Sequence, residues 1–195
     1  MIIGICGLIG SGKGTVADIL IEQHGFIKVS WADSLKDAVS VIFGWDRALL
    51  EGDTVESREW REQIDPWWAE RLGNPNLTPR WVLQVWGTEV GRDAFHNDIW
   101  VASLQNKVRD PSKNYVIPDT RFPNEVDSVR TMGGEIWRVK RGSDPRWFGR
   151  YVRRGLPPHS IHPSEWQWAR SEFDQVIEND GTLDELKKKV LDLVH

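Results

Sequence analysis

The sequence predicts an α/β fold in which a five-stranded parallel sheet is covered by helices on both faces. Three observations lead to this prediction. Short apolar runs alternate with segments of helical periodicity along most of the 195 residues. The first apolar run is followed by a glycine-rich loop and then directly by a helix. Two stretches of different composition interrupt the alternation, which continues after each of them.

The first four elements are expected within residues 2–43. Residues 2–6 form an apolar run closed by glycine, which is typical of a buried parallel strand. Residues 12–25 follow helical spacing and stop at a glycine, and residues 26–30 indicate a second strand. The next helix carries one apolar face at helical spacing, made of Leu35, Ala38, Val39 and Ile42.

The remaining elements continue the alternation. Two helices are expected at about 80–95 and 98–108, before a third strand at 115–119. A helix that begins at Pro123 and ends before Gly133 leads into the fourth strand, Glu135 to Val139. After a fifth strand, Gln175 to Ile177, Thr182 and Glu185 have the spacing of a capping box. That last helix is expected to bury Leu183, Leu186, Val190 and Leu191.

Two stretches differ in composition from the rest. Residues 44–79 are acidic, rich in tryptophan and broken by proline and glycine, which predicts an inserted, partly helical subdomain. Residues 141–172 are rich in arginine, proline and glycine, which predicts a mobile lid. We therefore expect one domain whose core is formed by residues 1–43, 80–140 and 173–195.

Composition excludes several classes of protein. The net charge is −4, whereas a protein that binds duplex nucleic acid usually carries a basic surplus. No apolar run is long enough to span a membrane, and the apolar start lacks the basic residues of a signal peptide. The single cysteine, Cys6, cannot form an internal disulfide, which suits a cytoplasmic location. Most of the twelve tryptophans are expected to pack the core or the insertion, with base stacking as the alternative.

The most specific motif is the string GLIGSGKGT, from Gly7 to Thr15. It has the G-x-x-x-x-G-K spacing of a phosphate-binding loop, and it lies between an expected strand and an expected helix. Backbone N–H groups of such a loop surround phosphate oxygens, and the lysine neutralises the β- and γ-phosphates. The expected ATP-binding residues here are Gly10, Ser11, Gly12, Lys13, Gly14 and Thr15.

The residue after Lys13 departs from the common motif. Gly14 stands where a hydroxyl residue usually binds Mg²⁺, and the hydroxyl follows one position later, at Thr15. We expect Mg²⁺ to be held by nucleotide phosphates and water, with Thr15 and Asp119 as its candidate protein ligands.

Asp119 and Arg121 follow the third strand, at the edge of the sheet where ligands of such folds bind. Asp119 can hold Mg²⁺ or its waters, or orient the acceptor through an arginine; the alternative is a helix N-cap. Arg121 can clamp a phosphate with both ends of its guanidinium group; the alternative is a surface ion pair with Glu125. Lys13, Asp119 and Arg121 are therefore catalytic candidates.

Longer strings carry a resemblance to a known family. The chain has no guanine-reading N-K-x-D at usable spacing, and GSGKGT is similar to the loop of nucleoside monophosphate kinases. Outside residues 44–79, the chain resembles the phage-type deoxynucleoside monophosphate kinases. The strings that match in order are WADSLKDA at 31–38, RWVLQVWGTEVGRD at 80–93, DIWV at 98–101, VIPDTRFPNEVD at 116–127 and VIENDGTLDEL at 176–186.

The resemblance implies a P-loop kinase fold and an activity. It implies ATP-dependent phosphorylation of deoxynucleoside monophosphates, with ATP and Mg²⁺ as cofactors. The insertion at 44–79 would bind the acceptor, and the lid at 141–172 would close over ATP. The acceptor-binding candidates are Lys36, Arg80, Gln84, Thr88, Arg92 and Arg121.

Several of these residues have a plain structural alternative. A lysine such as Lys36 usually lies on the solvated face of a helix, and Gln84 and Thr88, one helical turn apart, can be a polar stripe. Turn chemistry alone explains Asn179, which the resemblance places near the adenine of ATP. His162 and Glu165, in the string HPSE, resemble a lid motif of the family.

Five arginines of the lid can stabilise the charge that spreads over a phosphoryl group during transfer. They are Arg141, Arg146, Arg150, Arg153 and Arg154. We expect one or two of them to act, with Arg146 as an ATP ligand and Arg150 as a catalytic residue.

Two other functions remain open from the sequence. The acceptor can be a ribonucleotide, a small metabolite or a modified base in phage DNA. Alternatively, the chain can be an ATP-binding regulatory module that transfers no phosphate. We expect small nucleotides as partners, without stable nucleic-acid or membrane binding. The resemblance suggests a homodimer, located in the host cytoplasm if a phage encodes it.

Overall fold

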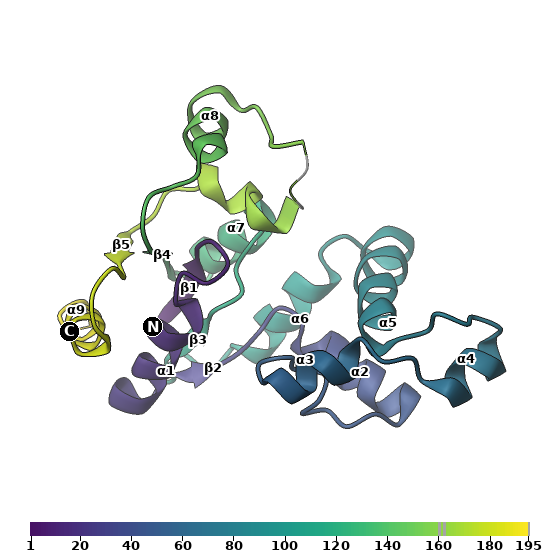
Figure 1. The fold of residues 1–195 in the computed structure, drawn as a ribbon. Coiled ribbons are helices and arrows are strands. Elements are labelled where there is room, and N and C mark those ends of the chain that lie inside the picture. The colour runs from purple at the N-terminus through teal and green to yellow at the C-terminus, as the bar shows by residue number, and fades with distance from the viewer. Residues whose placement is uncertain (160, 162, 195) are drawn as a thin grey trace. The chain divides into compact units, whose positions relative to one another are not determined.

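The computed structural model describes residues 1–159, 161 and 163–194, and the chain divides into two compact units (Figure 1). Unit 1 consists of Met1–Trp31 and Gln105–His195, and unit 2 of Ala32–Leu104. Each unit has its own hydrophobic core. Within the described residues, no helix is both long enough and apolar enough to cross a membrane.

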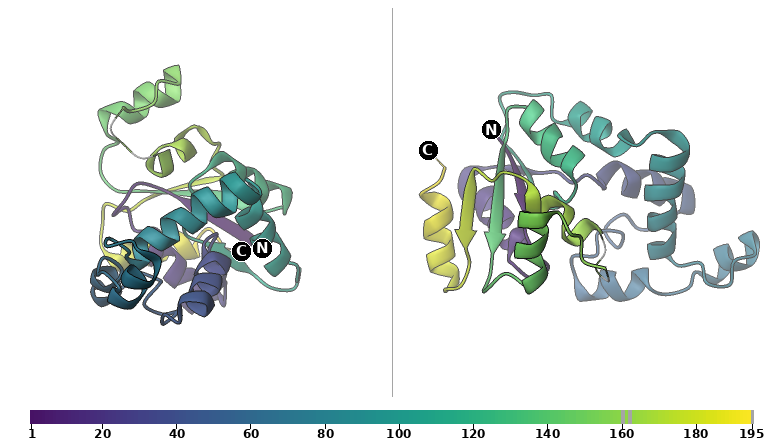
Figure 2. Two further views of the ribbon diagram at one scale, coloured as in Figure 1. Left: turned by 90° about the vertical axis from the view of Figure 1, so that its right-hand side faces the viewer. Right: turned by 90° about the horizontal axis from the view of Figure 1, so that it is seen from above.

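Unit 1 is built on a parallel sheet of five strands in the order β2-β3-β1-β4-β5, so the predicted fold class is confirmed. Figure 2 shows these strands edge to edge, with α9 beside β5. The central strand β1 pairs with β3 on one side and with β4 on the other. The strands are β1 (Ile2–Cys6), β2 (Ile27–Lys28), β3 (Tyr115–Ile117), β4 (Glu135–Lys140) and β5 (Gln175–Glu178).

The second strand is shorter than predicted. The sequence indicated a strand over residues 26–30, but β2 contains only Ile27 and Lys28, both exposed. It lies at the edge of the sheet, where one side has no neighbouring strand to extend it. Beyond β2, Ser30 and Trp31 bond instead to the side chain of Asp119.

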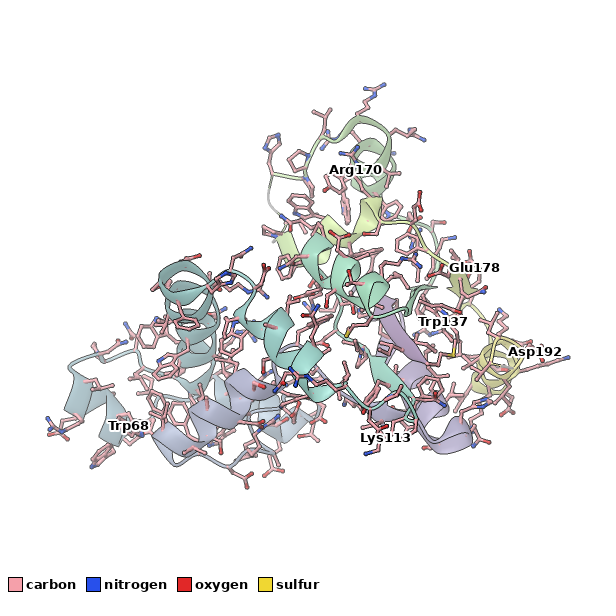
Figure 3. All side chains as sticks on the ribbon, turned by 180° about the vertical axis from the view of Figure 1, so that it is seen from behind. Trp68, Lys113, Trp137, Arg170, Glu178 and Asp192 are labelled. Atoms are coloured by element: carbon pink, nitrogen blue, oxygen red, sulfur yellow. The ribbon has the colours of Figure 1, made fainter. Side chains whose placement is uncertain are left out.

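Three helices pack against the sheet of unit 1. Helices α1 (Lys13–His24) and α9 (Leu183–Leu191) share one core with alternate residues of the strands, whereas α7 (Pro123–Thr131) packs on β1 and β4. Trp137 of β4, labelled in Figure 3, is fully buried in the core shared by α1 and α9. The start of α7 at Pro123 is confirmed.

The last helix confirms its predicted cap but not its whole predicted face. Thr182 and Glu185 form the reciprocal capping box. Leu186 and Val190 are buried, whereas Leu183 is 52% exposed and Leu191 is 39% exposed. A helix of nine residues at the edge of the unit buries a single i, i+4 stripe, so the prediction for the two outer leucines was wrong.

Between β4 and β5, the residues that the structure describes include three short helices. They are α8 (Arg146–Arg154) and two 3₁₀ turns, η2 (Pro163–Glu165) and η3 (Gln167–Arg170). Helix α8 packs on η3, and η3 packs on α7. The arginine-rich segment is therefore attached to the body of unit 1.

Unit 2, residues 32–104, contains helices and no strand. Its core is formed by apolar side chains from α2, α4 and α5 and by tryptophans, among them Trp68, labelled in Figure 3. Its elements are α2 (Asp33–Phe43), α3 (Val55–Arg61), α4 (Pro66–Leu72), α5 (Pro79–Val85), the π-helix η1 (Trp86–Phe95) and the start of α6 (Ile99–Lys107). As predicted, most tryptophans of this unit pack in or against the core, whereas Trp67 and Trp81 are exposed.

Two details of unit 2 differ from the sequence prediction. Ile42 is 47% exposed, and Phe43 takes its place in the core, where its ring stacks on Trp45 with the centroids 4.5 Å apart. The expected helix at 80–95 changes from α to π geometry at Trp86, a change that hydrophobic spacing does not reveal.

Candidate phosphate-binding site

The loop from Gly7 to Thr15 joins β1 to α1 and requires glycine at two positions. Gly7 has φ 153°, and a Cβ there would lie 2.4 Å from the carbonyl oxygen of Val139. Gly12 has φ 101°, and a Cβ there would lie 2.3 Å from Nδ2 of Asn179. Because glycine has no Cβ, the loop can lie this close to the backbone of Val139 and to the side chain of Asn179.

Lys13 begins α1 and reaches back over the loop. Its Nζ donates hydrogen bonds to the carbonyl oxygens of Gly7, at 2.9 Å, and Leu8, at 3.0 Å. Burial lowers the pKa of Lys13, and the nearby Arg121 guanidinium lowers it further, while Glu165 and Asp119 act in the opposite direction. The cation is therefore held where a bound anion would stabilise it.

The loop also contains a buried hydroxyl group. The Oγ of Ser11 is buried and makes no hydrogen bond to any residue that the structure describes. The carbonyl oxygen of the same residue accepts a 2.9 Å hydrogen bond from Nδ2 of Asn179, which follows β5. Asn179 therefore braces the phosphate loop, and its predicted contact with adenine stays a prediction.

Asp119 lies two residues beyond β3. Its Oδ2 accepts a 2.6 Å hydrogen bond from Oγ of Ser30, and its Oδ1 accepts one of 3.4 Å from the backbone N–H of Trp31. The next helix begins at Pro123 with Phe122 as its N-cap residue, so the alternative of a helix N-cap at Asp119 was wrong.

Arg121 makes its ion pair with a residue far along the chain. Its Nη1 lies 3.2 Å from Oε1 of Glu165 in η2. The buried carboxylate of Glu125 accepts hydrogen bonds from the backbone N–H groups of Arg121 and Phe122, at 2.8 and 3.1 Å. The expected alternative of a surface pair between Arg121 and Glu125 was therefore wrong, because Glu125 shapes the backbone instead.

Four charged side chains thus gather at the carboxyl ends of β1 and β3: Lys13, Asp119, Arg121 and Glu165. The sequence pointed to the first three as catalytic candidates. Glu165 was noticed only as part of the string HPSE, whose His162 lies outside the described residues. A pair of opposite charges 44 residues apart leaves no local pattern that spacing could reveal.

The arginines of the lid segment occupy the surface of unit 1. Arg146 and Arg150 lie four residues apart on α8, and both are exposed. Arg153 and Arg154 follow at the end of the same helix, and Arg141 precedes it; all three are exposed. Neither Arg146 nor Arg150 makes an ion pair with any described residue, so both are available to an anionic ligand.

One arginine of this region escaped the sequence analysis. Arg138 is buried on β4, pairs with Asp144 and lies 4.2 Å from the ring centroid of Phe148 in α8. The rings of Trp168 and Phe173 are also within 6 Å. This guanidinium group therefore anchors α8 to the sheet. In the sequence, Arg138 stands between Trp137 and Val139 in an apolar strand, and this pattern could have indicated a buried arginine.

Cys6 ends β1 and is buried. Burial, followed by the Glu125 carboxylate, raises the pKa of Cys6 to about 12. The thiol is therefore protonated at neutral pH and does not act as a nucleophile in this site.

Unit 2 carries the remaining predicted residues. Lys36 is buried on α2, with Nζ 2.6 Å from Oε2 of Glu51, so the alternative of a solvated lysine was wrong. Arg80, at the start of α5, pairs with Glu62 at 3.1 Å. These contacts place both cations beside carboxylates of unit 2.

The other acceptor candidates lie along α5 and η1. Gln84 is exposed on α5, and Thr88 is exposed on η1. Arg92 lies farther along η1 and is partly buried. Because the helix becomes π at Trp86, the assumption that these positions follow α-helical turns was wrong.

Comparison with known proteins gives one family and one fold. The sequence pattern of the family described as deoxynucleotide monophosphate kinase matches residues 68–190. A protein of Acanthamoeba polyphaga mimivirus is 30% identical over 209 residues, covering 100% of this chain and 96% of its own. The deoxynucleotide monophosphate kinase of Escherichia phage RB69 is 29% identical, covering 97% of each chain. The dephospho-CoA kinase of Campylobacter jejuni has a similar fold, with a TM-score of 0.50, 12% identity, and coverage of 98% and 94%.

Proposed function

Because the chain belongs to the deoxynucleotide monophosphate kinase family, we propose that it transfers the terminal phosphoryl group of ATP to a deoxynucleoside 5′-monophosphate. The observation that carries this proposal is the gathering of Lys13, Arg121 and Asp119 around a glycine loop of phosphate-binding geometry. The reaction yields a deoxynucleoside diphosphate and ADP.

The reaction mainly requires that the protein position the two phosphate groups and stabilise their negative charge. An oxygen of the acceptor phosphate attacks the γ-phosphorus of ATP, and the bond from that phosphorus to the β,γ-bridging oxygen breaks, so that ADP leaves. The attacking oxygen is already anionic at neutral pH, so the reaction needs no strong general base. Lys13 and the backbone N–H groups of the loop bind the β- and γ-phosphates, and Arg121 binds the phosphoryl group in transfer.

The residues present fit Mg²⁺, which would neutralise charge on the ATP phosphates when bound. The hydroxyl of Thr15 and the carboxylate of Asp119 are oxygen ligands of the kind that Mg²⁺ prefers. Within the described residues, no cluster of three or more His, Cys, Asp or Glu side chains is placed to hold a metal. A site with so few protein ligands suits an ion that arrives bound to nucleotide and keeps its waters.

The lid arginines supply further positive charge for this proposal. Arg146 and Arg150 lie exposed on α8, without a carboxylate partner among the described residues. We assign Arg146 to the ATP phosphates and Arg150 to the phosphoryl group in transfer, within a lid at 141–172. Asn179 supports the loop and, in this proposal, contacts the adenine side of ATP.

A coupled assay of ADP release tests the function. Purified protein with ATP and Mg²⁺ is given dAMP, dGMP, dCMP or dTMP, with the four ribonucleotides as comparison. We expect at least one deoxynucleotide to raise ADP release well above the rate with ATP alone. ATP consumption that no deoxynucleotide stimulates would refute the proposal, and stimulation only by ribonucleotides would redirect it to another acceptor class.

A further inference from the structure

Three arginines of unit 2 lie close to one another where the end of α3 packs against α5. Arg58 and Arg61 belong to the last turns of α3, and Arg80 is the second residue of α5. Burial lowers the pKa of Arg61, and the charges of Arg80 and Arg58 lower it further against the opposing Glu62 and Glu51. Three positive charges therefore lie close together where α3, in the acidic insertion, packs against the start of α5.

Of the three arginines, Arg61 has the weakest hydrogen-bond and ion-pair contacts with described residues. Its Nε is buried and makes no hydrogen bond to any described residue, and its Nη1 reaches the carbonyl oxygen of Glu51 only at 3.5 Å. It forms no ion pair within the part of the chain that the structure describes. Arg80, by contrast, has Glu62 at 3.1 Å.

The guanidinium group of Arg61 rests on the backbone of Gly52. A Cβ at Gly52 would lie 1.8 Å from Nη2 and 2.0 Å from Cζ of Arg61. Gly52 also has φ 69°, in the left-handed region that favours glycine. The turn before α3 thus leaves room for the Arg61 side chain without giving it a strong acceptor.

A purely structural role fits Arg58 better than Arg61. Arg58 donates to the carbonyl oxygens of Gly52, at 3.0 Å, and Asp53, at 2.9 Å, and so clamps the turn. Arg61 adds one marginal contact at the cost of burying a cation near two others. A half-buried guanidinium group without a carboxylate is most stable when an anion with several oxygens binds it.

We propose that Arg61, together with Arg80, binds the 5′-phosphate of the acceptor nucleotide. This inference rests on the proposed function, which requires one phosphate site for ATP and a second for the acceptor. Nη2 of Arg61 makes no hydrogen bond to any described residue and, unlike Nε, is not fully covered, so it is the donor that a phosphate can reach. Arg80 exchanges its exposed pair with Glu62 for the phosphate. A phosphate monoester carries the charge and the oxygen geometry that two guanidinium forks recognise.

The proposal also revises the role of Lys36. Its ammonium group is 2.6 Å from Glu51, and Glu51 is bound in addition by Arg47. The charge of Lys36 is therefore compensated inside unit 2. Arg61, which was not among the candidates from the sequence, keeps a reachable Nη2 group without a hydrogen-bond partner in the described residues.

The first test compares Arg61→Gln with Arg58→Gln and with Arg71→Gln, which removes an exposed arginine from α4. For Arg61→Gln, we expect KM for the deoxynucleotide to rise about 10- to 100-fold, with KM for ATP within about twofold of the unchanged protein. Both control variants should keep the unchanged KM for the acceptor. Arg61→Lys should recover part of the loss, because it restores charge without the fork.

A binding measurement separates the phosphate from the nucleoside. Calorimetry with a deoxynucleoside monophosphate and with its parent deoxynucleoside gives the affinity that the phosphate adds. Arg61→Gln should reduce that difference and leave deoxynucleoside binding unchanged. Gly52→Ala, which displaces the guanidinium without removing charge, should raise the acceptor KM in the same direction.

The outcomes distinguish the two proposals. If the unchanged protein is an active deoxynucleotide kinase but Arg61→Gln keeps its acceptor KM and its phosphate-dependent affinity, the role of Arg61 is refuted and the function stands. An equal loss in Arg58→Gln would also refute it, because a disturbed turn would then explain the effect. If no deoxynucleotide stimulates the unchanged protein, the function itself fails.

Discussion

The phosphate loop of unit 1 and the arginine group of unit 2 share an electrostatic property but differ in how they arise. Burial lowers the pKa of Lys13, with Arg121 as the next cause, and burial lowers the pKa of Arg61, with Arg80 as the next cause. Lys13 nevertheless has two carbonyl acceptors within 3.0 Å, whereas Arg61 has one at 3.5 Å.

The difference teaches how a binding cation can be recognised. A chain that places one buried cation beside another loses stability unless a ligand supplies the missing negative charge. In unit 1 a nine-residue motif predicts the position of the binding cation, because the backbone of a phosphate-binding loop requires glycines at known spacing. In unit 2 the cations come from two helices, and their partnership is visible only after folding.

The largest effect is expected at the loop. Lys13→Ala should lower kcat about 1,000-fold, because it removes the cation nearest the phosphates. The circular dichroism spectrum and the urea midpoint should stay close to those of the unchanged protein, which shows that the fold is intact. Activity within tenfold of the unchanged protein would break the assignment of Lys13.

The next test asks whether Arg61 and Arg80 bind one group. Because both are expected to contact the same phosphate, their effects on acceptor KM should not multiply. Arg61→Gln with Arg80→Gln should raise acceptor KM about 100-fold, less than the product of the two single changes. Steady-state kinetics on all four proteins of the cycle measure the coupling, and fully multiplicative effects would mean that the arginines act separately.

Arg138, whose charge is paired with the carboxylate of Asp144, provides a contrast to Arg61. Arg138→Met removes a cation held by Asp144 and Phe148, so the free energy of unfolding should fall by about 2 kcal/mol. Arg61→Gln should change it by less than about 0.5 kcal/mol, since its lost contact is marginal. Urea denaturation measures both values, and equal losses would erase the distinction between an anchoring and a binding arginine.

Loss of the hydrogen bond between Asn179 and the phosphate loop should have a smaller effect on kinetics. Asn179→Ala removes one neutral hydrogen bond to the carbonyl of Ser11, which is worth about 1 kcal/mol. We expect KM for ATP to rise about fivefold while acceptor KM stays unchanged. Asn114→Ala removes an exposed hydrogen bond that Asn114 accepts from the N-terminal ammonium group, outside the phosphate loop, and should leave both constants unchanged. A change in acceptor KM alone would contradict this role of Asn179.

The smallest expected effect is proton uptake by Lys13 when ATP binds. The pKa of Lys13 is lowered in the free protein, and the negative phosphates of ATP should raise it. Between those two pKa values the free lysine is neutral and the bound lysine is charged. ATP binding should therefore take up less than one proton there, and affinity should fall as pH rises through that range. Calorimetry in two buffers of different ionisation enthalpy measures the uptake, which Lys13→Met should abolish; proton release would contradict the assignment.

The sequence predicted the elements whose side chains repeat regularly. The alternation of apolar runs and helical faces indicated all five strands, and the glycine spacing located the loop before Lys13. It also indicated that Asp119 and Arg121 reach the carboxyl edge of the sheet, because that follows from strand order in a parallel sheet. The roles of these residues stay predictions.

The remaining features depend on contacts between distant residues. The pair of Arg121 and Glu165 spans 44 residues, and the burial of Lys36 depends on Glu51 in a loop that follows its helix. The change from α to π geometry at Trp86 leaves no mark in the hydrophobic spacing of the sequence. Arg61 was missed because nothing in the charge pattern of an acidic stretch marks one arginine as lacking a partner.

The buried thiol at the end of β1 gives the molecule a practical property. Cys6 is the one cysteine of the sequence, and with a pKa of about 12 it is both inaccessible and unreactive toward maleimides at neutral pH. Cysteines introduced at exposed positions, such as Val41 in unit 2 and Asp192 in unit 1, can therefore be labelled with fluorophores without first removing the natural one. Energy transfer between two such dyes would follow the distance between the units as ATP and deoxynucleotide are added in turn.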